Sequence, residues 1–87
     1  MPPDTSVPLH HVIFYTKAGC HLCDDARDLL EELAAEIIFE LTEIDIRTDP
    51  TIFETYRYRI PVLLIDGQHI VEGRISENDL RRAFARQ

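Results

Sequence analysis

Residues Thr16–Glu36 read "TKAGCHLCDDARDLLEELAAE", and they hold the chain's only two cysteines, three positions apart. The preceding "LHHVIFY", Leu9–Tyr15, is rich in β-branched and aromatic residues and predicts a buried strand. From Cys20 onward the apolar residues recur at helical spacing, which predicts a helix that begins at the first cysteine. They are Leu22, Ala26, Leu29, Leu30 and Leu33. The cysteine pair therefore marks the step from a strand to a helix.

Two further elements follow this helix. "IFELTEIDI", Ile38–Ile46, predicts a second strand, but its apolar residues change parity midway, which predicts a bulge or an early end. "TDPTIFETY" then predicts a short helix with Asp49 as its N-cap and Pro50 at its first position. A strand, helix and strand in this order favour a parallel pair joined by a crossover helix.

The C-terminal third predicts a hairpin and a last helix. "PVLLI" and "HIVE" flank the turn signal Asp66-Gly67, and Gly73 ends the second of these strands. "SENDLRRAFARQ" predicts a helix with Ser76 as N-cap and Asp79 three residues on. The order β-α-β-α-β-β-α predicts an α/β fold with a mixed four-stranded sheet and three helices. We expect one domain at residues 9–87 and a loose tail at residues 1–8.

Composition narrows the possible functions. The chain has 87 residues and a formal net charge of −7, so nucleic acid, which needs a basic face, is not an expected partner. No apolar run approaches the length of a membrane span, and the N-terminus has no signal-peptide pattern. The sequence therefore predicts a cytoplasmic protein without membrane contact. Thiols in that compartment are kept reduced, so a permanent structural disulfide is not expected.

The spacing of the cysteines suits thiol–disulfide exchange. At the start of a helix the Cys20 sulfur lies beside unpaired backbone N–H groups, which favour thiolate over thiol, and Lys17 adds a positive charge. Cys23 lies one turn further in, within reach of Cys20 but away from those groups. Cys20 is then the attacking thiol and Cys23 the resolving thiol. The acidic side chains of Asp24 and Asp25 oppose the thiolate.

Other uses of the pair remain open at this stage. C-x-x-C is half of a zinc site, and the histidines offer further ligands. They are His10, His11, His21 and His69. The two cysteines also suit a structural pair, because free cysteine packs as a small hydrophobe. A binding module that holds a metal or a partner thiol is therefore the alternative to an oxidoreductase.

Two further groups near the cysteines admit two interpretations each. His21 stabilises the Cys20 thiolate as an imidazolium, or it faces solvent. The cluster "YRYR", Tyr56–Arg59, precedes Pro61 and either presents cations to a substrate carboxylate or forms a solvated loop with its tyrosines packed on the sheet.

Together, residues Leu9–Phe84 resemble the thioredoxin-like fold, and specifically the short bacterial glutaredoxin-like proteins. "FYTKAGCHLC" is similar to the glutaredoxin strand, lysine and C-x-x-C opening, and "RIPVLLIDG" is similar to the proline segment of that fold. The resemblance implies a cis peptide at Ile60–Pro61, with Pro61 facing the cysteines. It also implies that the backbone of Ile60 pairs with a substrate peptide or with glutathione.

The resemblance further implies a monomeric thiol–disulfide oxidoreductase that reduces protein or glutathione mixed disulfides. It needs no bound cofactor or metal, with glutathione as a possible co-substrate. The segment "EGRISENDL", Glu72–Leu80, is closer to the thioredoxin pattern than to the glutathione-binding one, so both substrate classes stay open. The residues that we expect to take part in substrate or glutathione binding are Lys17, His21, Arg59, Ile60, Pro61 and Gly73.

Overall fold

The fold follows the predicted order of elements. The computed structural model describes residues 9–85, so the tail predicted at residues 1–8 lies outside the described residues. A short 3₁₀ turn, η1, follows the second strand and adds to the predicted set. The elements are β1 (His10–Thr16), α1 (His21–Leu33), β2 (Phe39–Asp45), η1 (Ile46–Thr48), α2 (Pro50–Tyr56), β3 (Val62–Ile65), β4 (His69–Glu72) and α3 (Glu77–Ala85).

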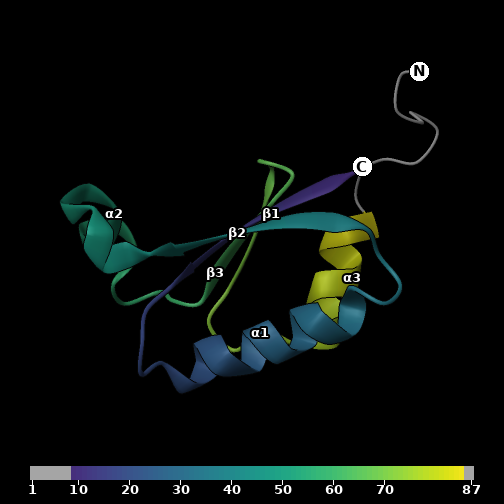
Figure 1. The fold of residues 1–87 in the computed structure, drawn as a ribbon, viewed down its shortest axis with the longest axis horizontal. Helices are drawn as coiled ribbons and strands as arrows, with labels where there is room; N and C mark the ends of the chain where they lie inside the picture. Colours follow the sequence, from purple (N-terminus) through teal and green to yellow (C-terminus); the bar gives the residue numbers. More distant parts are fainter. Residues whose placement is uncertain (1–8, 86–87) are drawn as a thin grey trace.

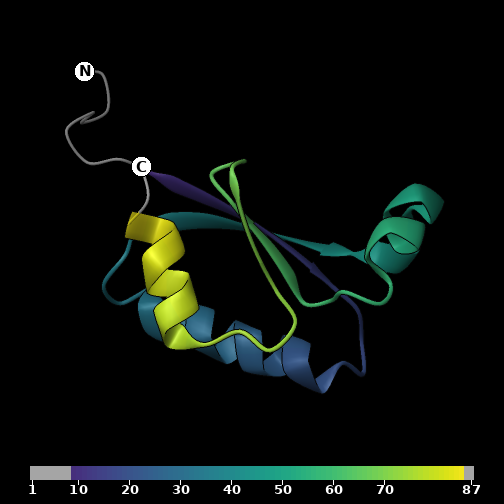
Figure 2. The same ribbon diagram turned by 180° about the vertical axis from the view of Figure 1, so that it is seen from behind.

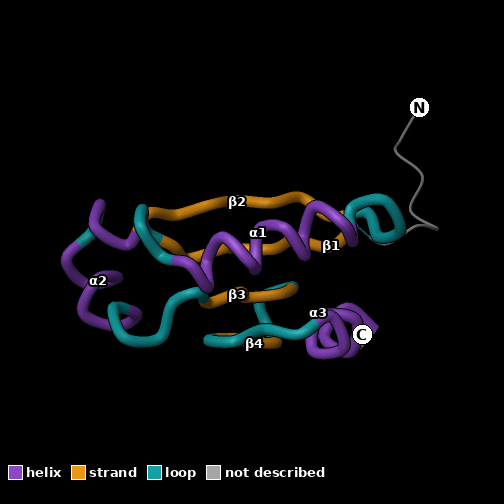
Figure 3. Tube along the Cα trace, turned by 90° about the horizontal axis from the view of Figure 1, so that it is seen from below, coloured by secondary structure: helices purple, strands orange, loops and turns teal. Residues whose placement is uncertain are grey.

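The four strands form one mixed sheet in the order β2-β1-β3-β4. β1 and β2 are parallel, while β3 pairs antiparallel with both β1 and β4. Helices α1 and α3 lie on the same face of the sheet, and α2 lies at one end of it (Figures 1 and 2). Viewed from below, α1 runs along β1, and α3 lies at the opposite end from α2 (Figure 3).

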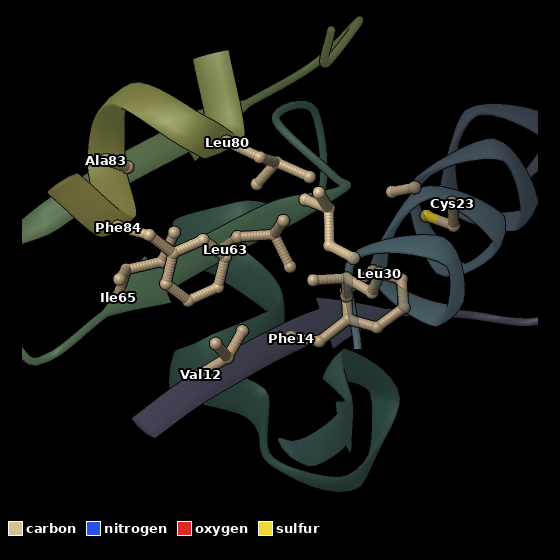
Figure 4. Packing of buried hydrophobic residues seen from close by; sticks show 11 residues of the cluster. Val12, Phe14, Cys23, Leu30, Leu63, Ile65, Leu80, Ala83 and Phe84 are labelled. Atoms are coloured by element: carbon tan, nitrogen blue, oxygen red, sulfur yellow. The ribbon is translucent and has the colours of Figure 1, made fainter. Parts of the chain in front are cut away.

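The core fills the layer between the sheet and helices α1 and α3 (Figure 4). Alternate residues of β1 point into it, and residues paired across strands share a face, as Phe14 does with Leu63. The buried cluster consists of Val12, Phe14, Cys23, Ala26, Leu30, Leu33, Leu63, Ile65, Leu80, Ala83 and Phe84. One of the two cysteines is thus a core residue.

The apolar residues of the second strand change parity inside a continuous strand. The register between β1 and β2 runs unbroken to Thr16↔Asp45, so there is no bulge, and the strand ends at Asp45, one residue before the predicted end. Ile44 therefore points to the face opposite that of Phe39 and Leu41. The Asp45 carboxylate accepts a hydrogen bond from the Arg47 N–H at 2.9 Å and starts the 3₁₀ turn. That turn buries Ile46 completely. β1 itself ends at Thr16, one residue later than predicted.

Both predicted helix caps are present. Asp49 Oδ1 accepts from the N–H groups of Thr51 and Ile52, at 2.8 and 3.2 Å. Ser76 and Asp79 exchange two hydrogen bonds, each side chain accepting from the other's backbone N–H at 3.1 and 3.2 Å. These local contacts fix where α2 and α3 begin, as the sequence predicts.

The predicted hairpin turn joins β3 to β4. Asp66 and Gly67 both adopt positive φ, 55° and 67°, and the Gln68 N–H donates to the Ile65 carbonyl at 3.1 Å. Such a turn matches the twist of the flanking strands. The Asp66 carboxylate also accepts from the His11 N–H at 2.9 Å, which ties the turn to β1.

No helix described between residues 9 and 85 has the length and apolar character needed to cross a membrane.

Candidate active site

The two cysteines lie at the N-terminus of α1 and are joined as a disulfide, with their Cα atoms 5.2 Å apart. The helix begins at His21, one residue later than predicted, and Cys20 is its N-cap. The Cys23 N–H donates to Cys20 Sγ at 3.2 Å, and the Asp24 N–H donates to the Cys20 carbonyl at 3.1 Å. The Cys20 sulfur therefore lies where the free N–H groups and the helix dipole favour negative charge.

The two cysteines differ in their access to solvent. Cys23 is 0% exposed and belongs to the buried cluster, whereas Cys20 is half-buried at the edge of that cluster. This difference confirms the prediction that Cys23 is the less exposed of the two. Cys20 is therefore the cysteine that is partly open to solvent, whereas Cys23 is enclosed by the core.

Charged side chains surround the first turn of α1. Lys17 and His21 are both exposed, and Lys17 makes no ion pair within the part of the chain that the structure describes. The Asp24 carboxylate accepts from Arg27 Nη1 at 3.1 Å, so one of the two opposing acids is partly neutralised. A hydrogen bond from Arg27 to Glu43, at 2.6 Å, is the main reason that the pKa of Arg27 is raised.

Pro61 lies next to the end of β1 that leads to Cys20. The Ile60–Pro61 peptide bond is cis, as the resemblance implies. Since Tyr15 pairs with Val62, continuing this register by one residue sets Pro61 opposite Thr16, on the face that α1 covers. The Gly73 N–H donates to the Pro61 carbonyl at 2.9 Å. The starts of α1 and β3 lie at the same end of the molecule in Figures 1 and 3.

The backbone before Pro61 is partly engaged already. The Ile60 N–H donates to the Tyr56 carbonyl at 3.2 Å, while no backbone N–H from residues 9–85 reaches the Ile60 carbonyl. The backbone pairing that the resemblance implies at Ile60 is therefore restricted to its carbonyl. That oxygen can accept one hydrogen bond from an incoming peptide.

Arg59 already has a carboxylate partner. Its Nη2 lies 2.7 Å from Glu72 Oε2, and its Nε lies 3.2 Å from Glu72 Oε1. These hydrogen bonds raise the pKa of Arg59 and lower the pKa of Glu72. A substrate carboxylate that binds Arg59 must therefore share it with Glu72 or displace Glu72.

The tyrosines before Pro61 behave differently from one another. Tyr56 stacks on Tyr15, with ring centroids 4.3 Å apart, so the prediction of packing on the sheet is right for Tyr56. Tyr58 is 87% exposed, and that prediction is wrong for it. Burial, followed by the contact with Tyr56, raises the pKa of Tyr15. Arg57 lies over the ring of Tyr58 at 4.8 Å.

Thr16 is a residue near the cysteines that sequence reasoning missed. Its side chain is buried, and its hydroxyl oxygen has no hydrogen-bond partner. The alternation of buried residues along β1, Val12, Phe14 and Thr16, was the signal that could have placed it in the core.

The histidines do not complete a metal site with the cysteines. Within residues 9–85, no group of three or more His, Cys, Asp or Glu side chains is arranged to hold a metal ion. A C-x-x-C pair supplies two of the four ligands of a structural zinc site, so the described residues do not provide a closed one.

Comparison with known proteins identifies the family. The family model described as "Glutaredoxin-like domain (DUF836)" matches residues 11–85. The chain belongs to this glutaredoxin-like family. An uncharacterised protein of Mycobacterium tuberculosis is 32% identical over 76 residues, covering 82% of this chain and 78% of that protein. A glutaredoxin-like protein of Dictyostelium discoideum is 30% identical over 76 residues, covering 80% and 70% of the two chains.

Solved structures place this glutaredoxin-like chain in the thioredoxin fold. A Nitrosomonas europaea protein superposes with a TM-score of 0.74 at 26% identity, covering 93% of this chain and 96% of that one. A thioredoxin of Halobacterium salinarum has a TM-score of 0.66 at 22% identity, covering 84% and 69%, which shows a shared fold alone. The predicted fold class is confirmed.

Proposed function

We propose that this glutaredoxin-like chain is a thiol–disulfide oxidoreductase in which Cys20 attacks and Cys23 resolves. One observation carries the proposal: Cys20 is partly exposed and its sulfur accepts a helix N-terminal N–H, while Cys23 is fully buried. A cysteine at a helix N-terminus is the more readily ionised and therefore the faster nucleophile. A buried neighbour one turn away attacks only what Cys20 has captured.

The reaction transfers two electrons from the dithiol to the substrate. The Cys20 thiolate attacks one sulfur of a substrate disulfide, so a mixed disulfide forms and the other substrate sulfur leaves as a thiolate, which takes a proton from solvent. The Cys23 thiolate then attacks Cys20 Sγ, which releases the second substrate thiol. The product is the Cys20–Cys23 disulfide seen in the structure. A thiol reductant, such as glutathione, or a disulfide reductase restores the dithiol.

The substrates that we propose are protein disulfides and glutathione mixed disulfides. The Ile60 carbonyl offers a hydrogen-bond acceptor beside Pro61, and Gly73 holds that segment through the Pro61 carbonyl. Lys17 and His21 are exposed next to Cys20 and would contact an anionic substrate. We further propose that the protein acts as a monomer in the cytoplasm, without a bound metal or other cofactor and with glutathione as a co-substrate.

A trapping experiment tests this function. Cys23→Ser keeps the attacking thiol and removes the resolving one, so incubation with glutathione disulfide should accumulate glutathione on Cys20, seen by mass spectrometry without reductant. Cys20→Ser is the matched control and should trap nothing. If purified wild-type protein carries stoichiometric zinc and the two substitutions release it equally, the cysteines are ligands and the oxidoreductase proposal is wrong.

A further inference from the structure

The hydroxyl group of Thr16 is buried without a partner in the disulfide form. The residue is 7% exposed, and within the described chain no other buried side-chain nitrogen or oxygen lacks a hydrogen bond. A buried donor without a partner costs free energy, so an unpaired hydroxyl calls for an explanation. An acceptor that becomes available in another state of the protein is one such explanation.

The spacing of residues along β1 and α1 sets Thr16 and Cys23 at the same end of the layer between the two elements. The Arg27 guanidinium lies over the Phe14 ring at 5.3 Å. From Arg27 back to Cys23 is one helical turn, about 6 Å, and from Phe14 on to Thr16 is about 7 Å along the strand. A crossover helix runs antiparallel to the strand before it. The step from Arg27 to Cys23 and the step from Phe14 to Thr16 therefore both lead toward the end of the sheet where α1 begins. Figure 4 shows Phe14 and Cys23 at the same end of the cluster.

The geometry points to Thr16 as a positioning residue whose hydroxyl donates a hydrogen bond to Cys23 Sγ once the disulfide is reduced. This inference rests on the proposed function. In the disulfide form, Cys23 Sγ is bonded to Cys20 and the Thr16 hydroxyl is unpaired. Reduction gives the sulfur a proton or a negative charge and frees it to turn toward the strand. Thr16 keeps its own proton throughout and takes no part in the electron transfer.

The hydrogen bond would assist the resolving step. A thiolate in apolar surroundings is disfavoured, and Cys23 is packed among apolar side chains. The charged or titratable groups on the elements packed around it all reach solvent: Lys17, Cys20, His21, Asp24, Asp25, Arg27 and Asp45. Asp24 pairs with Arg27, and Asp45 pairs with Arg47. Among the described residues, the Thr16 hydroxyl is thus the buried side-chain donor on the strand side of Cys23.

Thiolate titration of Cys23 tests the hydrogen bond directly and does not depend on catalysis. In a Cys20→Ser background, the ultraviolet absorbance of the remaining thiolate is followed against pH for Thr16, Thr16→Val and Thr16→Ser. Valine has nearly the same shape as threonine but lacks the hydrogen-bond donor. Thr16→Val should therefore raise the midpoint of the Cys23 titration by about one pH unit, which is a tenfold loss of thiolate at a pH below the midpoint. Thr16→Ser keeps the hydroxyl group, so its midpoint should lie close to that of the protein with Thr16. Equal midpoints in all three proteins would overturn the inference.

The redox equilibrium provides a second readout in the otherwise unmodified chain. Thr16→Val loses a contact of the reduced form only, so its equilibrium with glutathione should shift toward the disulfide by about tenfold, or about 30 mV more negative. A merely structural role would destabilise the oxidised and reduced forms alike and leave this equilibrium unchanged. That result would also contradict the inference.

Failure of the inference and failure of the proposed function are distinguishable. In one outcome, Cys23→Ser traps glutathione on Cys20 while Thr16→Val changes neither the Cys23 titration nor the redox equilibrium with glutathione. In that case the oxidoreductase proposal is supported and the proposed role of Thr16 is wrong. If nothing is trapped on Cys20, the function falls, and a role for Thr16 in the resolving step falls with it. The Cys23 titration then still shows whether the hydrogen bond exists.

Discussion

Arg59 and Glu72 form a two-point ion pair, with 2.7 Å between Nη2 and Oε2 and 3.2 Å between Nε and Oε1. The pair joins the segment before Pro61 to the last residue of β4 and neutralises a cation beside the candidate active site. Glu72 therefore competes with any anionic substrate for Arg59. This competition makes the contribution of Arg59 to substrate binding measurable.

Replacing Glu72 with glutamine should improve the binding of an anionic substrate. Glu72→Gln frees the Arg59 guanidinium, so the KM for a glutathione mixed disulfide should fall by roughly threefold, the effect of one exposed ion pair, with kcat unchanged. Steady-state kinetics with a glutathionylated peptide measure both constants. Glu54→Gln removes the same charge from Arg57 nearby and is the matched control. An equal fall in KM in both variants would show a general charge effect and no role for Arg59.

The order of alkylation should separate the two thiols of the reduced protein. Cys20 should react with iodoacetamide first because it is partly exposed at the helix N-terminus, whereas Cys23 is 0% exposed. Peptide mass mapping after brief alkylation between pH 5 and pH 9 gives the rate at each cysteine. Faster labelling of Cys23, or equal rates at all pH values, would reverse the assignment of the nucleophile.

Asp45 should contribute a pH-dependent part of the stability. Hydrogen bonds from Arg47 lower its pKa from 3.8 to about 2, so the ionised carboxylate stabilises the folded state. This contribution is complete above the ordinary pKa and is lost as the pH falls from about 4 to about 2. The Tm difference between wild type and Asp45→Asn should therefore be largest near neutral pH and shrink below pH 4. Asp28→Asn removes the same charge from an exposed face of α1 and is the matched control for the loss of one negative charge.

Core packing should matter far more than exposed apolar surface. Leu63 is 0% exposed and pairs with Phe14, so Leu63→Ala should lower the free energy of unfolding by about 2–5 kcal/mol. Leu41 is 40% exposed on the edge strand, and Leu41→Ala should cost less than about 1 kcal/mol. Urea denaturation of both variants measures the difference. Similar losses would mean that the layer beneath α1 is not the main core.

Local signals in the sequence were sufficient for most of the architecture. Asp49-Pro50 and Ser76 with Asp79 start helices because their side chains satisfy N–H groups two or three residues away. Asp66-Gly67 makes a turn because both residues tolerate positive φ. The C-x-x-C pair falls at the start of α1 for a similarly local reason. Each of these features depends on contacts within four residues, which the order of the amino acids fixes directly.

Contacts between distant segments needed the tertiary structure. From the sequence, Arg59 is expected to be a cation available to a substrate. In the structure, the pairing of β3 with β4 brings the Glu72 carboxylate into an ion pair with Arg59. The Ile60 N–H reads as available to a substrate, but the end of α2 supplies an acceptor at Tyr56. Thr16 lies outside the strand that the sequence predicts, but in the folded chain it ends β1 and is buried with its hydroxyl unpaired. Sequence spacing carries no information on such partners, because they depend on which strands pair and in which register, and only the folded sheet sets both.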